Sequence, residues 1–256
     1  LARVFKKGDW RSGYYRDQTL MLALGLATPE SILAQLYADT YNDPFSKGRQ
    51  MNSHFATPMI DPSNGEWLNQ MDQYNSAADV SCTGGQMARA LGIAFASKKY
   101  RNNQSSDKNK FSNKGNEVCF VTIGEASTSE GVFWETMNAS AVLQIPMAVS
   151  VWDDGYGISV PVTLQTAKAS ISEALAGLQA DENQPGIQIY TAKAWDYAYL
   201  VEIYQSGIDK VRNEHQPALF HIQECTQPQG HSTSGSHERY KSTERLAWEK
   251  EMDCIA

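Results

Sequence analysis

Two acidic residues, Glu125 and Asp154, each follow an apolar segment that is predicted to be a buried strand. Residues 118–123 are apolar and rich in β-branched side chains and stop at Gly124, and residues 147–152 have the same character. Parallel strands joined by a helix end at the same edge of a sheet, where open α/β sheets bind ligands. We therefore expect the two carboxylates to converge at that edge.

The segment between these strands has the spacing of a helix that ends at Pro146. Its apolar positions are Phe133, Met137, Ala141 and Val142. The residues before it are of types that cap helices: Ser127, Thr128 and Ser129. A bound anion would lie over the backbone amides at the start of this helix.

Two unpaired carboxylates at one sheet edge repel each other unless a cation lies between them. Mg²⁺ accepts a few carboxylate and carbonyl oxygens and fills its remaining positions with phosphate and water. The pattern alone leaves two interpretations open. Glu125 and Asp154 hold a metal-bound phosphate, or they are ordinary loop carboxylates after two buried strands.

The segment from Gly124 resembles the thiamine diphosphate signature, Gly-Asp-Gly followed by Asn-Asn, of the α part of 2-oxo acid dehydrogenase decarboxylating components. The resemblance implies that Glu125, Asp154 and the carbonyl of Tyr156 hold the Mg²⁺ of the cofactor. It places the cofactor beside three further residues, Gly124, Ala126 and Ser127. Glu125 replaces the family's Asp, Ala126 its second Gly, and Asp153-Asp154 its Asn-Asn. The added negative charge should strengthen metal binding and weaken attraction for the diphosphate.

Tyr15 and Arg16 stand just before a predicted helix. The planar guanidinium of Arg suits phosphate binding, although a Tyr-Arg pair at such a place is more often structural. The run from Tyr14 to Asp17 is similar to the family's Tyr-Tyr-Arg-Asp motif. The similarity implies that Tyr15 and Arg16 contact the diphosphate.

A histidine, His54, lies in a loop-like segment after Gly48-Arg49-Gln50. A lone loop His is more often solvated or structural than catalytic. The resemblance places His54 at the substrate end of the site, with Met51 and Phe55 as apolar walls.

The loop 80–83 precedes a predicted helix with small residues at Ala88, Gly92 and Ala96. These residues let a helix approach a sheet or a partner helix closely. The resemblance adds that Ser81 and Thr83, in the preceding loop, contact the thiamine ring.

The segment 230–240 is rich in Gly and Ser, follows a predicted strand, and is expected to be a flexible active-site loop. It resembles the family's Gly-His-Ser and His-Ser-Thr-Ser loop, which implies that His231 contacts the diphosphate and the reaction intermediate. The family has an Arg shortly before this His, whereas residues 226–229 contain none. Ser232 occupies a position that is phosphorylated in some relatives, where added charge would repel the diphosphate. An unmodified serine is the alternative.

Strands and helices alternate along the chain without internal repeats. Beyond the segments above, the pattern predicts helices at 29–41, 168–178 and 195–211 and strands at 186–190 and 217–225. Residues 100–116 are polar and are expected to form a loop or insertion. The fold class is therefore α/β, a doubly wound, mostly parallel sheet with helices on both faces, which is the thiamine diphosphate-binding fold in the family.

The composition is that of a globular protein in which residues 1–256 form a single domain. A net charge of −7 argues against a nucleic-acid surface, and no segment has the length of a membrane span. Four isolated cysteines predict a reducing, cytoplasmic location and no zinc site. Leu1 is not an initiator Met and the chain stops within a helical pattern, so we expect truncation at both ends.

The resemblance covers Tyr14 to Lys241, with four motifs in the family's order. It implies oxidative decarboxylation of a 2-oxo acid, branched-chain acids being favoured, with acyl transfer to the lipoyl group of an acyltransferase. The expected partner is a β-type half, on a separate chain or fused beyond Ala256, in a dimer or heterotetramer. The alternatives are a pyruvate or acetoin dehydrogenase of this family and a non-catalytic assembly or regulatory subunit.

Overall fold

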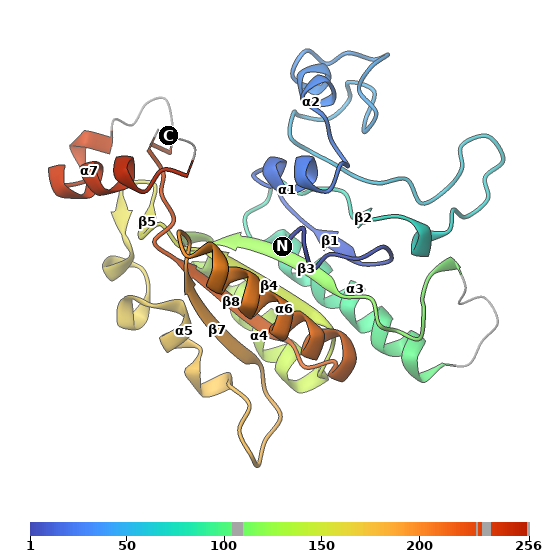
Figure 1. Cartoon of the computed structure of the whole chain (residues 1–256). Helices are drawn as coiled ribbons and strands as arrows, with labels where there is room; N and C mark the ends of the chain where they lie inside the picture. Colours follow the sequence, from blue (N-terminus) through green and yellow to red (C-terminus); the bar gives the residue numbers. More distant parts are fainter. Residues whose placement is uncertain (104–109, 229, 232–236, 255–256) are drawn as a thin grey trace.

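The structure, a computed structural model, describes residues 1–103, 110–228, 230–231 and 237–254. Its main sheet has six strands, all parallel, in the order β2-β1-β3-β4-β8-β7 (Figure 1). The strands are β1 (Trp10–Ser12), β2 (Asn75–Ser76), β3 (Cys119–Gly124), β4 (Met147–Trp152), β7 (Gln188–Lys193) and β8 (Ala218–Gln223). A separate antiparallel pair consists of β5 (Tyr156–Gly157) and β6 (Val160–Pro161). The helices are α1 (Gln18–Ala23), α2 (Pro29–Leu36), α3 (Gly85–Asn102), α4 (Gly131–Leu143), α5 (Ile171–Ala174), α6 (Tyr197–Glu214) and α7 (Thr243–Glu251).

The central strands β3 and β4 form where the two apolar segments predicted them. They pair in register along their whole length, with Val121 opposite Val149. Both strands are buried on their two faces except at their last residues, Gly124 and Trp152. A strand covered on both sides must be apolar throughout, which explains the continuous apolar runs in the sequence.

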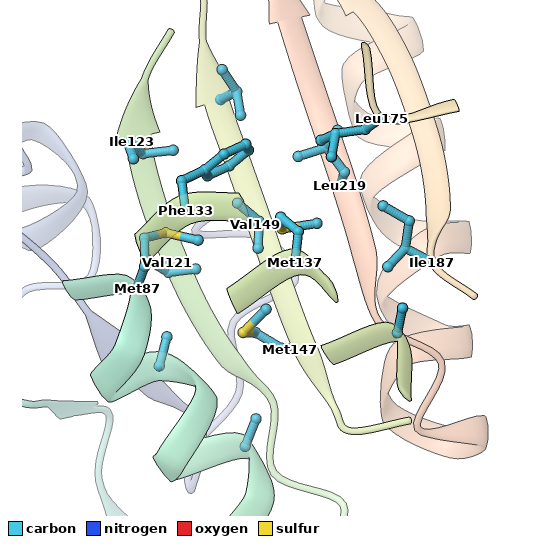
Figure 2. Packing of buried hydrophobic residues seen from close by; sticks show 14 of the residues in the cluster. Met87, Val121, Ile123, Phe133, Met137, Met147, Val149, Leu175, Ile187 and Leu219 are labelled. Carbon is cyan, nitrogen blue, oxygen red and sulfur yellow. The ribbon is translucent and has the colours of Figure 1, made fainter. Parts of the chain in front are cut away.

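Helices α3 and α4 cover one face of the sheet. Phe133 and Met137 of α4 and Met87 of α3 point toward the strands (Figure 2). All three side chains are fully buried. Burying one such side chain stabilises the fold by about 1.5–3 kcal/mol. Val142 is 73% exposed and lies outside this packed face, contrary to the sequence prediction.

Helix α6 covers the opposite face, as Figure 1 shows. Its Tyr204 stacks on Phe220 of β8 with ring centroids 4.4 Å apart, and the Tyr204 hydroxyl donates a hydrogen bond to Ser150 of β4. Asp196 caps the helix by accepting a hydrogen bond from the Tyr199 amide. Helices on both faces of a parallel sheet confirm the predicted doubly wound α/β class.

Several predicted elements differ from the observed ones. Helix α2 ends at Leu36 rather than at Tyr41, because Ala38 adopts a left-handed backbone conformation with φ 51°. The predicted helix at 168–178 is broken into short turns around α5, since Lys168 and Ala169 also have positive φ. Helix α3 continues to Asn102, inside the segment expected to be a loop.

Strands β1 and β2 had no signal in the sequence. They contain three and two residues, and their polar side chains are buried. No helix in the described part of the chain has the length and apolar character of a membrane span.

Two predicted packing faces are exposed. On α2 the apolar residues turn outward, with Leu33 52% and Leu36 58% exposed, while Ala34 and Gln35 are buried instead. The small residues of α3 are exposed as well: Ala88, Gly92 and Ala96. These positions therefore do not make the close contact with the sheet that their size permits.

Candidate functional site

Five adjacent parallel strands deliver their following loops to one edge of the sheet. The loops after β1, β2, β3, β4 and β8 line one cavity of about 650 Å³. Its wall contains nearly all residues that the sequence singled out: Tyr15, Arg16, Ser81, Thr83, Gly124, Glu125, Ala126, Ser127, Asp154, Tyr156 and His231. The parallel arrangement is the reason, because it sends the carboxyl end of every strand to the same side.

Glu125 and Asp154 both line this cavity, as their positions after β3 and β4 predicted. Glu125 is only 3% exposed. Its burial, together with the charges of Asp154 and Asp153, raises the pKa of Glu125 to about 8. Burial also raises the pKa of Asp154. Both carboxyl groups are thus harder to ionise than in water. A bound cation would favour their ionised forms.

The turn that carries Asp154 is fixed by its own polar groups. The carboxylate of Asp153 accepts a hydrogen bond from the Gly155 amide at 2.8 Å, and that of Asp154 accepts one from the Tyr156 amide at 3.2 Å. Gly155 has φ +81°, a conformation that favours glycine. The other carboxylate oxygen of Asp153 lies 2.7 Å from Nε2 of the fully buried His221 on β8. The turn is therefore tied to the sheet.

The start of the helix after β3 differs from the prediction. A 3₁₀ turn, Ala126–Ser129, separates the strand from α4, and the residue before α4, Glu130, makes no side-chain cap. Thr128 instead donates to the carbonyl of Glu125. The backbone that faces the cavity is consequently that of Ala126 and Ser127, and the first turn of α4 is not part of its wall.

Ala126 packs tightly against Gly157. A Cβ atom at Gly157 would lie 2.8 Å from the Cβ of Ala126 and 2.7 Å from Oε1 of Gln165. Gly157 therefore has no room for a side chain unless its neighbours shift.

A buried ion cluster presents Tyr15 and Arg16 to the cavity. Arg11 of β1 is fully buried and pairs with Asp17 at 2.9 Å and Asp79 at 2.8 Å. Asp17 also accepts a hydrogen bond from Thr122 of β3. These contacts fix both ends of the short loop between β1 and α1.

Arg16 and His231 meet at the cavity. A guanidinium nitrogen of Arg16 lies 3.0 Å from Nε2 of His231. Because an arginine only donates, this His nitrogen must accept, and Nδ1 carries the proton. Burial, followed by the Arg16 charge, lowers the pKa of His231. Nδ1 is buried and has no hydrogen-bond partner among the described residues.

His54 lies beside the cavity rather than in its wall. Its Nε2 is 2.6 Å from the hydroxyl of Ser81, and its ring stacks with that of Tyr15 at 6.4 Å. Met51 lines the adjoining depression of about 390 Å³ with His54. The prediction that Phe55 forms an apolar wall of the site is wrong. Its ring is fully buried in the core, and its centroid lies 5.1 Å from that of the Phe45 ring.

Two residues near the carboxylates were not identified from the sequence. Gln165 donates to Glu125 at 3.4 Å, and Arg245 of α7 donates to the carbonyl of Asp154 at 2.7 Å. Both belong to segments without a local motif, so no sequence signal could have found them. Ser232 lies outside the described residues.

The donor set suits one kind of metal. In the ranges that the structure describes, no group of three or more His, Cys, Asp or Glu side chains could hold a metal ion. Two carboxylates and a backbone carbonyl instead fit a hard cation that takes its other ligands from phosphate and water.

Comparisons with known proteins agree with this geometry. A family model described as "Dehydrogenase E1 component" matches residues 1–256. The alpha subunit of 2-oxoisovalerate dehydrogenase from Bacillus subtilis is 27% identical over 96% of this chain and 63% of its own length. The pyruvate dehydrogenase E1 alpha subunit of Rickettsia typhi is 23% identical over 98% of this chain and 65% of its own. The alpha subunit of acetoin:2,6-dichlorophenolindophenol oxidoreductase from Bacillus subtilis is 29% identical over 56% of this chain and 40% of its own.

The chain therefore spans less than two thirds of the length of these relatives. The match over all of its residues shows that it belongs to the dehydrogenase E1 component family, as an alpha-type member.

Proposed function

We propose that this chain is the part of a thiamine diphosphate-dependent 2-oxo acid dehydrogenase that binds Mg²⁺ and the cofactor diphosphate. One observation carries the proposal. Two acidic side chains, the buried Glu125 and the half-buried Asp154, and a pair of hydrogen-bond donors, the cationic Arg16 and the neutral His231, line the same cavity at the carboxyl edge of the sheet. A metal-bound diphosphate is complementary to both.

Each residue then has a role that follows from its position. Glu125, Asp154 and the carbonyl of Tyr156 hold the metal. Arg16 donates to the diphosphate, and His231 presents its Nδ1 proton. Ser81, which is hydrogen-bonded to His54, and Thr83 line the same cavity, and we assign the thiamine ring and the substrate to their side of it. Thiamine diphosphate, when bound, supplies the carbanion that attacks a 2-oxo acid.

The substrate class in this proposal is the branched-chain 2-oxo acids. The support is the naming of a similar Bacillus subtilis protein as a 2-oxoisovalerate dehydrogenase subunit. Pyruvate and acetoin are the competing substrates, since relatives named for them also match. Decarboxylation further requires a β-type half, and the acyl group passes to a lipoylated acyltransferase. We expect the isolated chain to show no catalytic turnover of 2-oxo acids.

The test is calorimetric titration of thiamine diphosphate into the full-length polypeptide with its β-type partner, with and without Mg²⁺. Mg²⁺-dependent binding supports the site. Rates of decarboxylation of branched-chain 2-oxo acids and of pyruvate, and of carbon–carbon cleavage of acetoin, which has no carboxyl group, then rank the substrates. The non-catalytic alternative rests on Asp154, whose added charge disfavours a diphosphate, and on the lack of an Arg in residues 226–229. It becomes the better account if no binding occurs with Mg²⁺ present.

A further inference from the structure

Arg245 joins α7 to the turn that carries Asp154. Nη2 of Arg245 donates to the backbone carbonyl of Asp154 at 2.7 Å, and Nε donates to Oε1 of Glu249 at 2.8 Å. Figure 1 shows α7 beside β5, which begins at Tyr156. Arg245 is not in the cavity wall, so it reaches the site only through the turn.

The anchor on the other side of Arg245 is itself fixed. Glu249 is 1% exposed, and both of its oxygens accept hydrogen bonds at 2.8 Å from Nζ of Lys241. Lys241 is 5% exposed. A buried carboxylate is stable only when its oxygens are paired in this way. Moving Glu249 would leave its charge buried and unpaired, at a large cost in free energy. The hydrogen bond to Glu249 therefore fixes the position of the Arg245 guanidinium.

The same cations contact the side chain of Tyr156. Nζ of Lys241 lies 5.3 Å from the centre of the Tyr156 ring, and the guanidinium of Arg245 lies 5.8 Å from it. The centroid of the Tyr240 ring lies 5.7 Å from that of the Tyr156 ring. These distances are those of cation–π contacts. The turn is therefore held by its backbone at Asp154 and by its side chain at Tyr156.

We propose that Arg245 is a positioning residue for the metal and diphosphate site. With Lys241 and Glu249 it forms a clamp, defined by these three residues, that keeps the turn in its binding geometry before the cofactor arrives. Charge adds to the need for a clamp: when Glu125 loses its proton to take the metal, its carboxylate and those of Asp153 and Asp154 lie close together, and their mutual repulsion opposes this geometry of the turn. A turn that is already in place does not have to be ordered during binding. This inference rests on the proposed function.

The experiment compares Arg245→Ala with Lys250→Ala in the full-length polypeptide assembled with its β-type partner. Lys250 is an exposed cation on the same helix, so its variant removes equal charge without touching the turn. The readouts are thiamine diphosphate affinity at saturating Mg²⁺ and amide hydrogen exchange of residues 153–157 in cofactor-free protein. Arg245→Ala should weaken binding by about 10- to 100-fold and speed exchange in 153–157. Lys250→Ala should change neither.

Unchanged affinity or unchanged exchange in Arg245→Ala overturns the clamp. Should the alanine variant not fold, Arg245→Lys replaces it, because it keeps the charge but can satisfy only one of the two acceptors. Weaker binding at an unchanged unfolding temperature then supports the clamp, and wild-type binding overturns it. If the unsubstituted protein does not bind the cofactor, the proposed function fails, and the exchange measurement still decides whether Arg245 holds the turn.

Discussion

Nε2 of His231 lies 3.0 Å from a guanidinium nitrogen of Arg16, although 215 positions separate the two residues in the chain. The contact fixes the tautomer of His231, because Arg16 can only donate. It leaves the Nδ1 proton of a neutral imidazole buried beside the cavity, with no hydrogen-bond partner in the part of the chain that the structure describes. The Nδ1 proton is therefore free to donate a hydrogen bond to an anion in the cavity, such as a diphosphate oxygen.

We expect His231→Ala to weaken thiamine diphosphate binding by about 10- to 100-fold, since a hydrogen bond to a charged group contributes about 1.5–3 kcal/mol. His231→Gln, which keeps an amide donor, should lose less. The measurement is calorimetric titration with Mg²⁺ present, and His237→Ala serves as the control because His237 is outside the cavity wall. Equal affinity of the His231→Ala variant would remove this residue from the site.

Mg²⁺ binding should release about one proton at pH 7. Because the pKa of Glu125 is raised to about 8, its carboxyl holds a proton at pH 7 until a metal displaces it. Metal affinity should therefore fall as the pH drops below about 8, by at most tenfold per pH unit. Titrations of Mg²⁺ in buffers of different protonation enthalpy count the protons.

The matched variant is Glu125→Gln, which keeps the shape of the side chain and removes its charge. It should bind Mg²⁺ more weakly and release no proton from this position. A wild-type proton count in the Glu125→Gln protein would contradict the assignment of Glu125 as a ligand.

Acid should destabilise the fold through His215. Burial lowers the pKa of His215 to about 4, and its Nε2 donates to the carbonyl of Gly115 at 2.6 Å. The unfolded chain binds a proton near its ordinary pKa of 6.5, so the free energy of unfolding falls as the pH drops from 6.5 to 4. Between pH 7 and pH 5 the loss should be on the order of 1 kcal/mol.

Urea unfolding at pH 7 and pH 5 measures this difference directly. His215→Gln has no group that titrates in this range, and its stability should depend less on pH. An equal pH dependence in both proteins would show that other groups cause the acid sensitivity.

Phe55 and Met51 should behave in opposite ways. Phe55→Ala leaves a cavity in a fully buried cluster and should lower the free energy of unfolding by about 3–5 kcal/mol. Met51 is 67% exposed, so Met51→Ala should leave stability within about 0.5 kcal/mol of the unsubstituted protein. Chemical denaturation of both variants gives the comparison. A small loss of unfolding free energy in Phe55→Ala would contradict the assignment of Phe55 to the core.

The sequence predicted the centre of the fold correctly because the central strands are covered on both faces. Such strands must be apolar along their whole length, and this leaves a continuous signal at β3 and β4. Their parallel direction then placed Glu125 and Asp154 at one edge. Short polar strands leave no such signal: β1 depends on its pairing with β3 and on the buried ion pairs of Arg11, and β2 depends on its pairing with β1.

Local sequence also determined which residue types were available for chemistry: acidic groups after β3 and β4, and the Tyr15-Arg16 and His231 segments. Tertiary structure alone decided how they combine. It paired Arg16 with His231, turned Phe55 into the core, and brought Arg245 to the carbonyl of Asp154. The physical reason is that these contacts join groups distant in sequence. Their formation depends on how loops at the sheet edge pack, and no spacing within a segment records that.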